Sequence, residues 1–324
     1  MVKHPIGEAN ESSIFGSLTE DEFYHRHSVT HSSEFITNSR GLNQFTHWWF
    51  PKPPTKPTAV IAVLHGFTGD SDWFVKLNSA FFAESGFIVC ALDYQGHGLS
   101  EGLEFHIPDI NPIIDDCIEF IDRFREKHAP DLPAFIYGES LGAAIALYIT
   151  FRQKGAWDGI VLASAMCGIS RQAYPPWPLE HLGSLVARFI PTWRVIPTEG
   201  METSVASKEE WKRKLALARP WRMKIPRLRV ATALEILRLC NDIQGHFEEV
   251  EVPFLIVHGE LDGACDPECV KELYKRASSK DKTITIYPDM WHQLVIEPQE
   301  NVDLVFGDIV DWIKTRTTAK SRDD

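Results

Sequence analysis

The sequence contains no apolar run as long as the roughly 18 residues that a membrane-spanning helix needs. The stretch from Met1 to Glu11 also lacks the apolar core of a secretion signal. Basic residues are fewer than acidic ones: the 33 Lys and Arg and the 45 Asp and Glu give a formal net charge of −12. Nucleic-acid binding needs a basic surface. We therefore expect a cytoplasmic protein that binds no nucleic acid.

Cysteine is scarce as well, with six residues in 324, too few for a disulfide framework in a chain of this size. Three of them fall inside apolar runs and are expected to be reduced core residues: Cys90, Cys117 and Cys167. Cys265 and Cys269 could join His258 in a metal site, but there is no C-x-x-C pair to support one. The sequence therefore predicts neither a metal nor a cofactor.

One stretch does carry a chemical signature. Between Phe135 and Leu147, an apolar strand meets a helix of small residues through Gly138-Glu-Ser-Leu-Gly142. In a G-x-S-x-G turn the serine sits on a strained strand-to-helix corner, and the glycines let the two backbones approach. Ser140 is therefore the candidate nucleophile. The alternative is an ordinary turn with a serine at a helix N-terminus, unless other loops supply a base, an acid and an oxyanion hole.

Strand and helix patterns alternate along most of the chain. A predicted hairpin is followed by buried-type apolar runs at 59–64, 87–92, 134–137, 159–164, 252–258 and 283–287. Helical spacing separates several of them, most clearly between Ile110 and Phe124. This alternation predicts an α/β fold, in which helices cover both faces of a parallel sheet and the site lies at the carboxyl ends of the strands.

The same patterns divide the chain into segments. Residues 1–31 are polar and are interpreted as a surface arm. The strand and helix alternation occupies 32–167 and 251–316, which we assign to one core. It stops between 168 and 250, which we interpret as an inserted cap, and 317–324 would form a tail.

Two late loops supply an acid and a base. Asp262 and His292 each follow an apolar strand, and the order Ser140, Asp262, His292 is that of the α/β-hydrolases. His292 would take the proton of Ser140, and Asp262 would orient the imidazole. Asp266 is the competing acid, but it directly precedes Pro267 at a predicted helix start, where capping is its expected role.

The oxyanion hole needs two backbone N–H groups near the nucleophile. Leu141 would supply one and Phe67 the other, with Gly66 giving the backbone room. The side chains of His65 and His97 are expected to brace these loops by hydrogen bonding. Three side chains near the site are weaker candidates for substrate contact: His65, Trp291 and Cys265.

These motifs together resemble a known family. The pieces that carry the resemblance are His65-Gly-Phe, Gly138-Glu-Ser-Leu-Gly, His258-Gly-Glu-Leu-Asp and Trp291-His292. They look like the monoacylglycerol lipase-like serine hydrolases, above all the plant branch with the caffeoylshikimate esterases, over residues 30–316. The resemblance implies the α/β-hydrolase fold, with a mostly parallel eight-stranded sheet flanked by helices. It also implies the triad, both oxyanion donors and a mobile lid between strands six and seven.

The implied activity is hydrolysis of a carboxylic ester through an acyl-enzyme, without a cofactor. The ester would be a monoacylglycerol or a phenolic ester such as caffeoylshikimate. Animal monoacylglycerol lipases use a lid tyrosine near the glycerol head, yet this lid has no tyrosine between Tyr174 and Tyr274. Acyl transfer, a specialised-metabolism reaction on the same serine and a hydrolase-fold receptor stay open as alternatives. No pattern indicates an oligomeric state.

The predicted lid has an uneven charge. Nine basic residues face only Glu209 and Glu210: Lys208, Lys212, Arg213, Lys214, Arg219, Arg222, Lys224, Arg227 and Arg229. Trp211 and Trp221 lie among them. One interpretation is a solvated helix face. The other is contact with an anionic partner, either a membrane surface or the carboxylate of an ester substrate.

Overall fold

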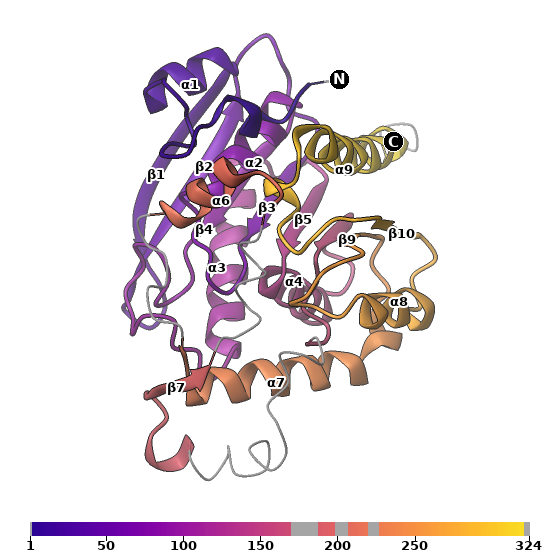
Figure 1. Ribbon diagram of the computed structural model, residues 1–324. Coiled ribbons are helices and arrows are strands. Elements are labelled where there is room, and N and C mark those ends of the chain that lie inside the picture. Colours follow the sequence, from indigo (N-terminus) through magenta and orange to yellow (C-terminus); the bar gives the residue numbers. More distant parts are fainter. Residues whose placement is uncertain (1, 170–186, 198–206, 220–226, 321–324) are drawn as a thin grey trace.

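A computed structural model of the protein describes residues 2–169, 187–197, 207–219 and 227–320. Its centre is an eight-stranded sheet of order β1-β2-β4-β3-β5-β6-β9-β10, with helices on both faces (Figure 1). The strands are β1 (Val29–Thr37), β2 (Asn43–Pro51), β3 (Val60–Leu64), β4 (Ile88–Leu92), β5 (Ala134–Glu139), β6 (Gly159–Ala163), β9 (Phe254–Gly259) and β10 (Lys282–Tyr287). The pairings of β2 with β1 and β4 are antiparallel and the others are parallel. The predicted mostly parallel sheet is confirmed.

The central strands are apolar because both of their faces are covered. Every residue of β3, β4 and β6 is buried. Successive side chains of a strand point to opposite faces, so Ala62 packs into one hydrophobic cluster while Ile61 and Val63 pack into the other. The first cluster includes side chains of α3 (Asn111–His128), α4 (Leu141–Arg152), α7 (Val230–Gly245) and α8 (Pro267–Arg276). The second includes side chains of α1 (Glu20–Arg26), α2 (Phe74–Glu84), α6 (Glu210–Leu217) and α9 (Gln299–Lys320).

The interpretation of residues 1–31 as a surface arm is wrong. Several of its apolar side chains enter the second cluster, where Ile6 of the 3-10 helix η1 (Pro5–Glu8) and Phe23 of α1 are fully buried. His4 is buried too, with its Nε2 3.1 Å from Asn78 Oδ1. The first strand begins at Val29, so position 31 is no structural boundary. The last helix likewise continues past the predicted tail boundary at 317.

The insertion lies between β6 and β9, the sixth and seventh strands of the main sheet, as predicted. It carries a small antiparallel ribbon of β7 (Arg194–Pro197) and β8 (Arg227–Arg229), followed by α7. Its helix α6 lies apart from α7, toward the other face of the sheet (Figure 1). Two short 3-10 helices are also present: η3 (Phe247–Glu249) and η4 (Leu294–Ile296).

Candidate active site

The elbow predicted around Ser140 has the strained geometry that such a turn requires. β5 ends at Glu139, α4 begins at Leu141, and Ser140 between them has a φ of 53°. A non-glycine residue in this left-handed region is uncommon, and such strain concentrates at functional sites. The turn projects Ser140 from the carboxyl end of β5, beside the ends of β3 and β6.

The two glycines of the motif are needed because backbones touch at both positions. A Cβ at Gly142 would lie 2.1 Å from the carbonyl oxygen of Leu64, and one at Gly138 would lie 2.4 Å from that of Gly142. Neither neighbour is a flexible side chain that can move aside. The helix α4 therefore packs against β3 and β5 at a distance that only glycine permits.

We expect Gly142→Ala to destabilise the protein by about 3 kcal/mol or more, because overpacking against rigid backbone forces the helix away from the sheet. Urea denaturation would measure the loss. Gly245→Ala is the matched control: it lies at the end of α7, and a Cβ there would meet nothing within 4 Å. Equal stabilities of the two variants would contradict the close approach.

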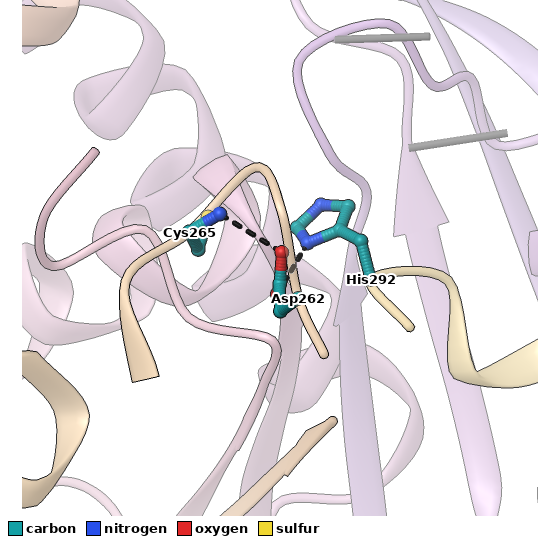
Figure 2. A group of neighbouring side chains, drawn as sticks. All are labelled: Asp262, Cys265 and His292. Atoms are coloured by element: carbon teal, nitrogen blue, oxygen red, sulfur yellow. Dashed lines mark hydrogen bonds and ion pairs between the residues drawn. The ribbon is translucent and has the colours of Figure 1, made fainter. Parts of the chain in front are cut away.

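The acid and the base come from neighbouring strands. Asp262 follows β9 and His292 follows β10, and because these strands are parallel their loops meet at one edge of the sheet. His292 Nδ1 lies 2.7 Å from Asp262 Oδ2 (Figure 2). The other carboxylate oxygen, Oδ1, accepts the backbone N–H groups of Ala264 at 2.8 Å and Cys265 at 2.9 Å. These contacts fix the carboxylate and present it to the imidazole.

Sequence reasoning missed a second histidine beside this carboxylate. His258, the fifth residue of β9, is fully buried and places its Nε2 3.2 Å from Asp262 Oδ2. Burial opposes ionisation of Asp262, but His292 and His258 more than offset it and hold the pKa of Asp262 below its usual range. The available signal was the spacing, since His258 precedes Asp262 by four residues at the end of the same strand.

Asp266 lies in the same loop but faces a different group. Its carboxylate accepts the N–H of Glu268 at 3.0 Å and caps the first turn of α8. This is the capping role expected from its place before Pro267. Of the two candidate acids, the structure brings only Asp262 to His292.

The surroundings of His292 predict a pH dependence. Burial alone lowers the pKa of His292, but the charge of Asp262, the hydrogen bond to it and the charge of Glu139 together raise that pKa above its usual value of 6.5. A general base must be neutral to accept a proton. We therefore expect kcat/KM to fall on the acid side with a midpoint above pH 6.5. Glu139→Gln, which removes one of the raising charges, should move this midpoint to lower pH; a wild-type midpoint at or below 6.5 would contradict the assignment.

Cys265 lies beside the candidate nucleophile and close to Asp262 and His292. Its Sγ is 4.0 Å from Ser140 Oγ. One ligand atom from each of Asp262, Cys265 and His292 lies within 4.8 Å of the others, and Figure 2 shows these three side chains together. The contact of Ser140 Oγ is thus to Cys265 and that of His292 Nδ1 is to Asp262, with no hydrogen bond between Ser140 and His292 among the described residues. Catalytic hydrogen bonds often tighten only in the complex with substrate. The thiol is 1% exposed, and burial followed by the charge of Asp262 raises the pKa of Cys265. Such a thiol is a poor nucleophile.

The loop that carries Phe67 abuts Ser140. A Cβ at Gly66 would lie 3.4 Å from the Cβ of Ser140, so the next N–H, that of Phe67, emerges beside the nucleophile. The carbonyl of Gly66 accepts from Gly69 N at 2.9 Å and lies 2.8 Å from His65 Nδ1. In a trans peptide the C=O and N–H point in opposite directions. Holding the Gly66 carbonyl therefore aims the Phe67 N–H.

The two histidines near this loop act as braces in the structure. Besides its contact with Gly66, His65 accepts the N–H of Tyr94 at its Nε2, 3.3 Å away. Burial lowers the pKa of His65, which keeps the ring neutral. His97 Nε2 lies 2.7 Å from the carbonyl oxygen of Phe67. Both nitrogens of His65 are thus engaged inside the protein, and neither is free for a substrate.

Several basic residues of the insertion have acidic or carbonyl partners within the protein. Lys212 is 1% exposed and pairs with Glu209 at 2.9 Å, and Lys214 pairs with Glu11 at 2.8 Å. Arg219 is buried and bonds the carbonyl of Thr68. Glu11 and Thr68 are remote in sequence from the residues they contact, which is why the local sequence did not reveal these two contacts. Arg222, Lys224 and Trp221 lie outside the described residues.

Comparisons with known proteins show the family and the fold of the chain. The family described as serine aminopeptidase, S33, matches residues 55–299. Caffeoylshikimate esterase of Arabidopsis thaliana is 30% identical over 304 residues, which cover 93% of this chain and 90% of that protein. Monoglyceride lipase of Homo sapiens is 28% identical, over 87% of this chain and 90% of its own length. A soluble variant of monoglyceride lipase from Saccharomyces cerevisiae, solved with a substrate analog, has the same fold at a TM-score of 0.76, with 18% identity over 89% of this chain and 95% of that one.

Proposed function

Because the chain belongs to the α/β-hydrolase family described as serine aminopeptidase, S33, we propose that it hydrolyses a carboxylic ester through Ser140, His292 and Asp262. The relatives named above are an esterase and a lipase, which supports ester over peptide substrates. The observation that carries the proposal is the 2.7 Å contact of His292 with Asp262, assembled next to a serine in a strained elbow.

The steps follow from the positions of the donors. Asp262 accepts a hydrogen bond from Nδ1 of His292, so the proton stays on Nδ1 and the lone pair of Nε2 is available. Nε2 takes the proton of the Ser140 hydroxyl as Oγ attacks the ester carbonyl. The oxyanion that forms is stabilised by the N–H groups of Phe67 and Leu141. When the tetrahedral intermediate collapses, the C–O bond to the alcohol breaks and His292 gives its proton to that alcohol.

The acyl group then leaves in a second displacement. A water molecule gives its proton to His292 Nε2 and attacks the ester carbonyl of acylated Ser140. The same oxyanion donors stabilise the second intermediate, and its collapse returns the proton to Ser140 Oγ and releases the carboxylic acid. An alcohol in place of water would give acyl transfer, so product analysis with a competing alcohol separates hydrolysis from transfer.

We propose an ester with an apolar or aromatic acyl group, either a hydroxycinnamoyl ester or a monoacylglycerol. The test is a panel of caffeoyl, coumaroyl and feruloyl esters and of monoacylglycerols of several chain lengths, compared by kcat/KM. A hydroxycinnamoyl preference would place the protein with the Arabidopsis relative, and a monoacylglycerol preference would place it with the human one. No turnover on either set by protein that a phosphonate probe still labels would contradict the substrate proposal alone.

None of the helices in the described part of the chain is long and apolar enough to cross a membrane. We propose a cytoplasmic protein that contacts membranes peripherally. The support for this contact is apolar, since Phe189 and Trp193 beside β7 are 75% and 61% exposed. Vesicle sedimentation of a Phe189→Ala, Trp193→Ala double variant tests it. Wild-type protein that fails to sediment with anionic or neutral vesicles would end this proposal.

A further inference from the structure

Residues 207–219 of the insertion, called the strap below, connect two loops of the candidate site. The strap contains α6, and its side chains Leu215 and Ala216 are fully buried in the second hydrophobic cluster. At its first end, Ser207 Oγ donates to the carbonyl oxygen of Ile296 at 2.8 Å. That carbonyl belongs to the loop between β10 and α9, which also carries His292.

Two lysines of the strap converge on one glutamate of that loop. Lys208 Nζ lies 3.3 Å from Glu297 Oε2, and Lys212 Nζ donates to the carbonyl oxygen of Glu297. The Glu297 carboxylate is 2% exposed and accepts the N–H of Trp291 at 2.7 Å. Trp291 directly precedes His292 in the chain. The first end of the strap is thus linked to the candidate base: its lysines contact Glu297, and Glu297 contacts Trp291, the neighbour of His292.

The second end of the strap contacts the loop that carries Phe67 (residues 65–69), called the oxyanion loop from here on. Trp73 Nε1 donates to the carbonyl oxygen of Leu215 at 3.1 Å, and Arg219 Nη1 donates to the carbonyl oxygen of Thr68 at 2.7 Å. Thr68 directly follows Phe67, whose N–H is the proposed oxyanion donor. The strap therefore spans from the loop of the base to the loop of the oxyanion hole.

The oxyanion loop is held at three successive carbonyl groups. The side chains that face them are His65 at Gly66, His97 at Phe67 and Arg219 at Thr68. The two histidines belong to the core, whereas Arg219 comes from the insertion. Because a peptide chain has only two soft torsions per residue, holding the Gly66 and Phe67 carbonyls restricts the direction of the Phe67 N–H. Holding the Thr68 carbonyl fixes the next peptide plane, on which the position of the Phe67 carbonyl depends.

The contacts of Arg219 favour a role in holding the Thr68 carbonyl over a role as a stabilising ion pair with Asp70. Its side chain is 6% exposed, and Nε is 3.9 Å from Oδ2 of Asp70. Within the described residues, neither of these two atoms has a hydrogen-bond partner. A buried pair at that separation is weak evidence for stabilisation. Among the described residues, the guanidinium makes its short hydrogen bond to the carbonyl oxygen of Thr68.

We propose that Arg219 is a positioning residue for the oxyanion hole. By holding the Thr68 carbonyl, it keeps the Phe67 N–H aimed at the reacting carbonyl of the ester. The strap thereby contributes to the rate at which Ser140 attacks that carbonyl. The inference rests on the proposed function, because the Phe67 N–H matters only if Ser140 attacks an ester. It gives the insertion a part in the chemical step, apart from any part in admitting substrate.

The test compares Arg219→Met, which has no donor, with Arg219→Lys, which keeps a cationic donor. Arg213→Met is the matched control, since Arg213 lies on the same strap, is exposed and pairs with Glu210 of its own helix. The assays are kcat and KM on p-nitrophenyl acetate and the affinity of a trifluoromethyl ketone, whose adduct with serine is an oxyanion. Loss of a whole oxyanion donor lowers kcat about 10²- to 10³-fold, so a misaimed one should lower it by roughly 10-fold or more.

For Arg219→Met we expect that loss in kcat, an equal loss in ketone affinity and a KM within about twofold of wild type, since a uniform binding effect would change KM instead. Arg219→Lys should recover most of the loss, and Arg213→Met should match wild type. If Arg219→Met does not fold, Trp73→Phe, which removes the N–H to Leu215 and keeps the ring, should give the same split at smaller size. Wild-type kcat and ketone affinity in a folded Arg219→Met would overturn the inference, as would a rise in KM alone. If Arg219→Met does not fold, the same results in a folded Trp73→Phe would overturn it.

The two proposals fail separately. Full activity in Ser140→Ala would refute the proposed function and this inference with it. An inactive Ser140→Ala together with wild-type kinetics in Arg219→Met would refute the inference about the strap and leave the proposed function standing.

Discussion

Replacing Ser140 with alanine is expected to lower ester hydrolysis by about four to six powers of ten, the range seen when a triad nucleophile is removed. The protein should still fold. Alanine has the same Cβ in the same left-handed backbone, and the contact it loses is the one to Cys265 Sγ at 4.0 Å. Far-UV circular dichroism and the melting temperature check the fold, and a fluorophosphonate probe reports the nucleophile.

Ser164 provides the matched control for this experiment. It also follows a strand of the sheet, has a φ of 45° and lies near the site, where its Oγ donates to the carbonyl oxygen of His292 at 2.6 Å. Its hydroxyl is committed to that bond, so Ser164→Ala should keep the phosphonate labelling that Ser140→Ala loses. Labelling that survives in Ser140→Ala and disappears in Ser164→Ala would transfer the nucleophile to Ser164.

Replacing Asp262 with asparagine is the second change with a large expected effect. The amide can donate to Nδ1 of His292, which would place the imidazole proton on Nε2, the atom that must accept from Ser140. The corresponding change in a Ser-His-Asp triad lowers kcat about 10⁴-fold, and we expect a loss of that order in kcat on p-nitrophenyl acetate. Loss of the Asp262 charge should also lower the pKa of His292, so the acid limb of any residual activity should move to lower pH.

Asp266→Asn separates this effect from a general disturbance of the loop. Asparagine caps helices about as well as aspartate, so the start of α8 should lose less than about 0.5 kcal/mol. Turnover should stay near that of wild type, because Asp266 contacts Glu268 and not His292. A larger loss of kcat in Asp266→Asn than in Asp262→Asn, with both proteins folded, would contradict the choice of acid.

The parts of the fold that the sequence predicts are those in which local pattern and burial coincide. The run from Ala59 to Leu64 is apolar because both faces of β3 are covered. Gly142 is required because its Cβ would strike the backbone of β3. Each of these features is encoded within a few consecutive residues, so a single sequence is enough to read them.

The features that were missed depend on partners far apart in the chain. Ile6 and Phe23 lie in a mostly polar stretch, without a helical or strand period to mark them, yet both enter the core beside α2 and α9. In the sequence Lys214 belongs to a basic run, and its ion pair with Glu11 is visible only in the structure. Arg219 looks like one more charge of that run, and its contact with Thr68 crosses 151 residues of sequence. Composition alone cannot supply such pairings.

Capture of an acyl-enzyme would show whether Ser140 is the nucleophile. The protein is mixed with a hydroxycinnamoyl or p-nitrophenyl ester, quenched in acid within milliseconds and digested for peptide mass mapping. The account predicts a mass increase equal to the acyl group on the peptide that contains Ser140, absent from Ser140→Ala and prolonged in Asp262→Asn. Turnover without any covalent adduct, or an adduct mapped to another residue, would contradict it.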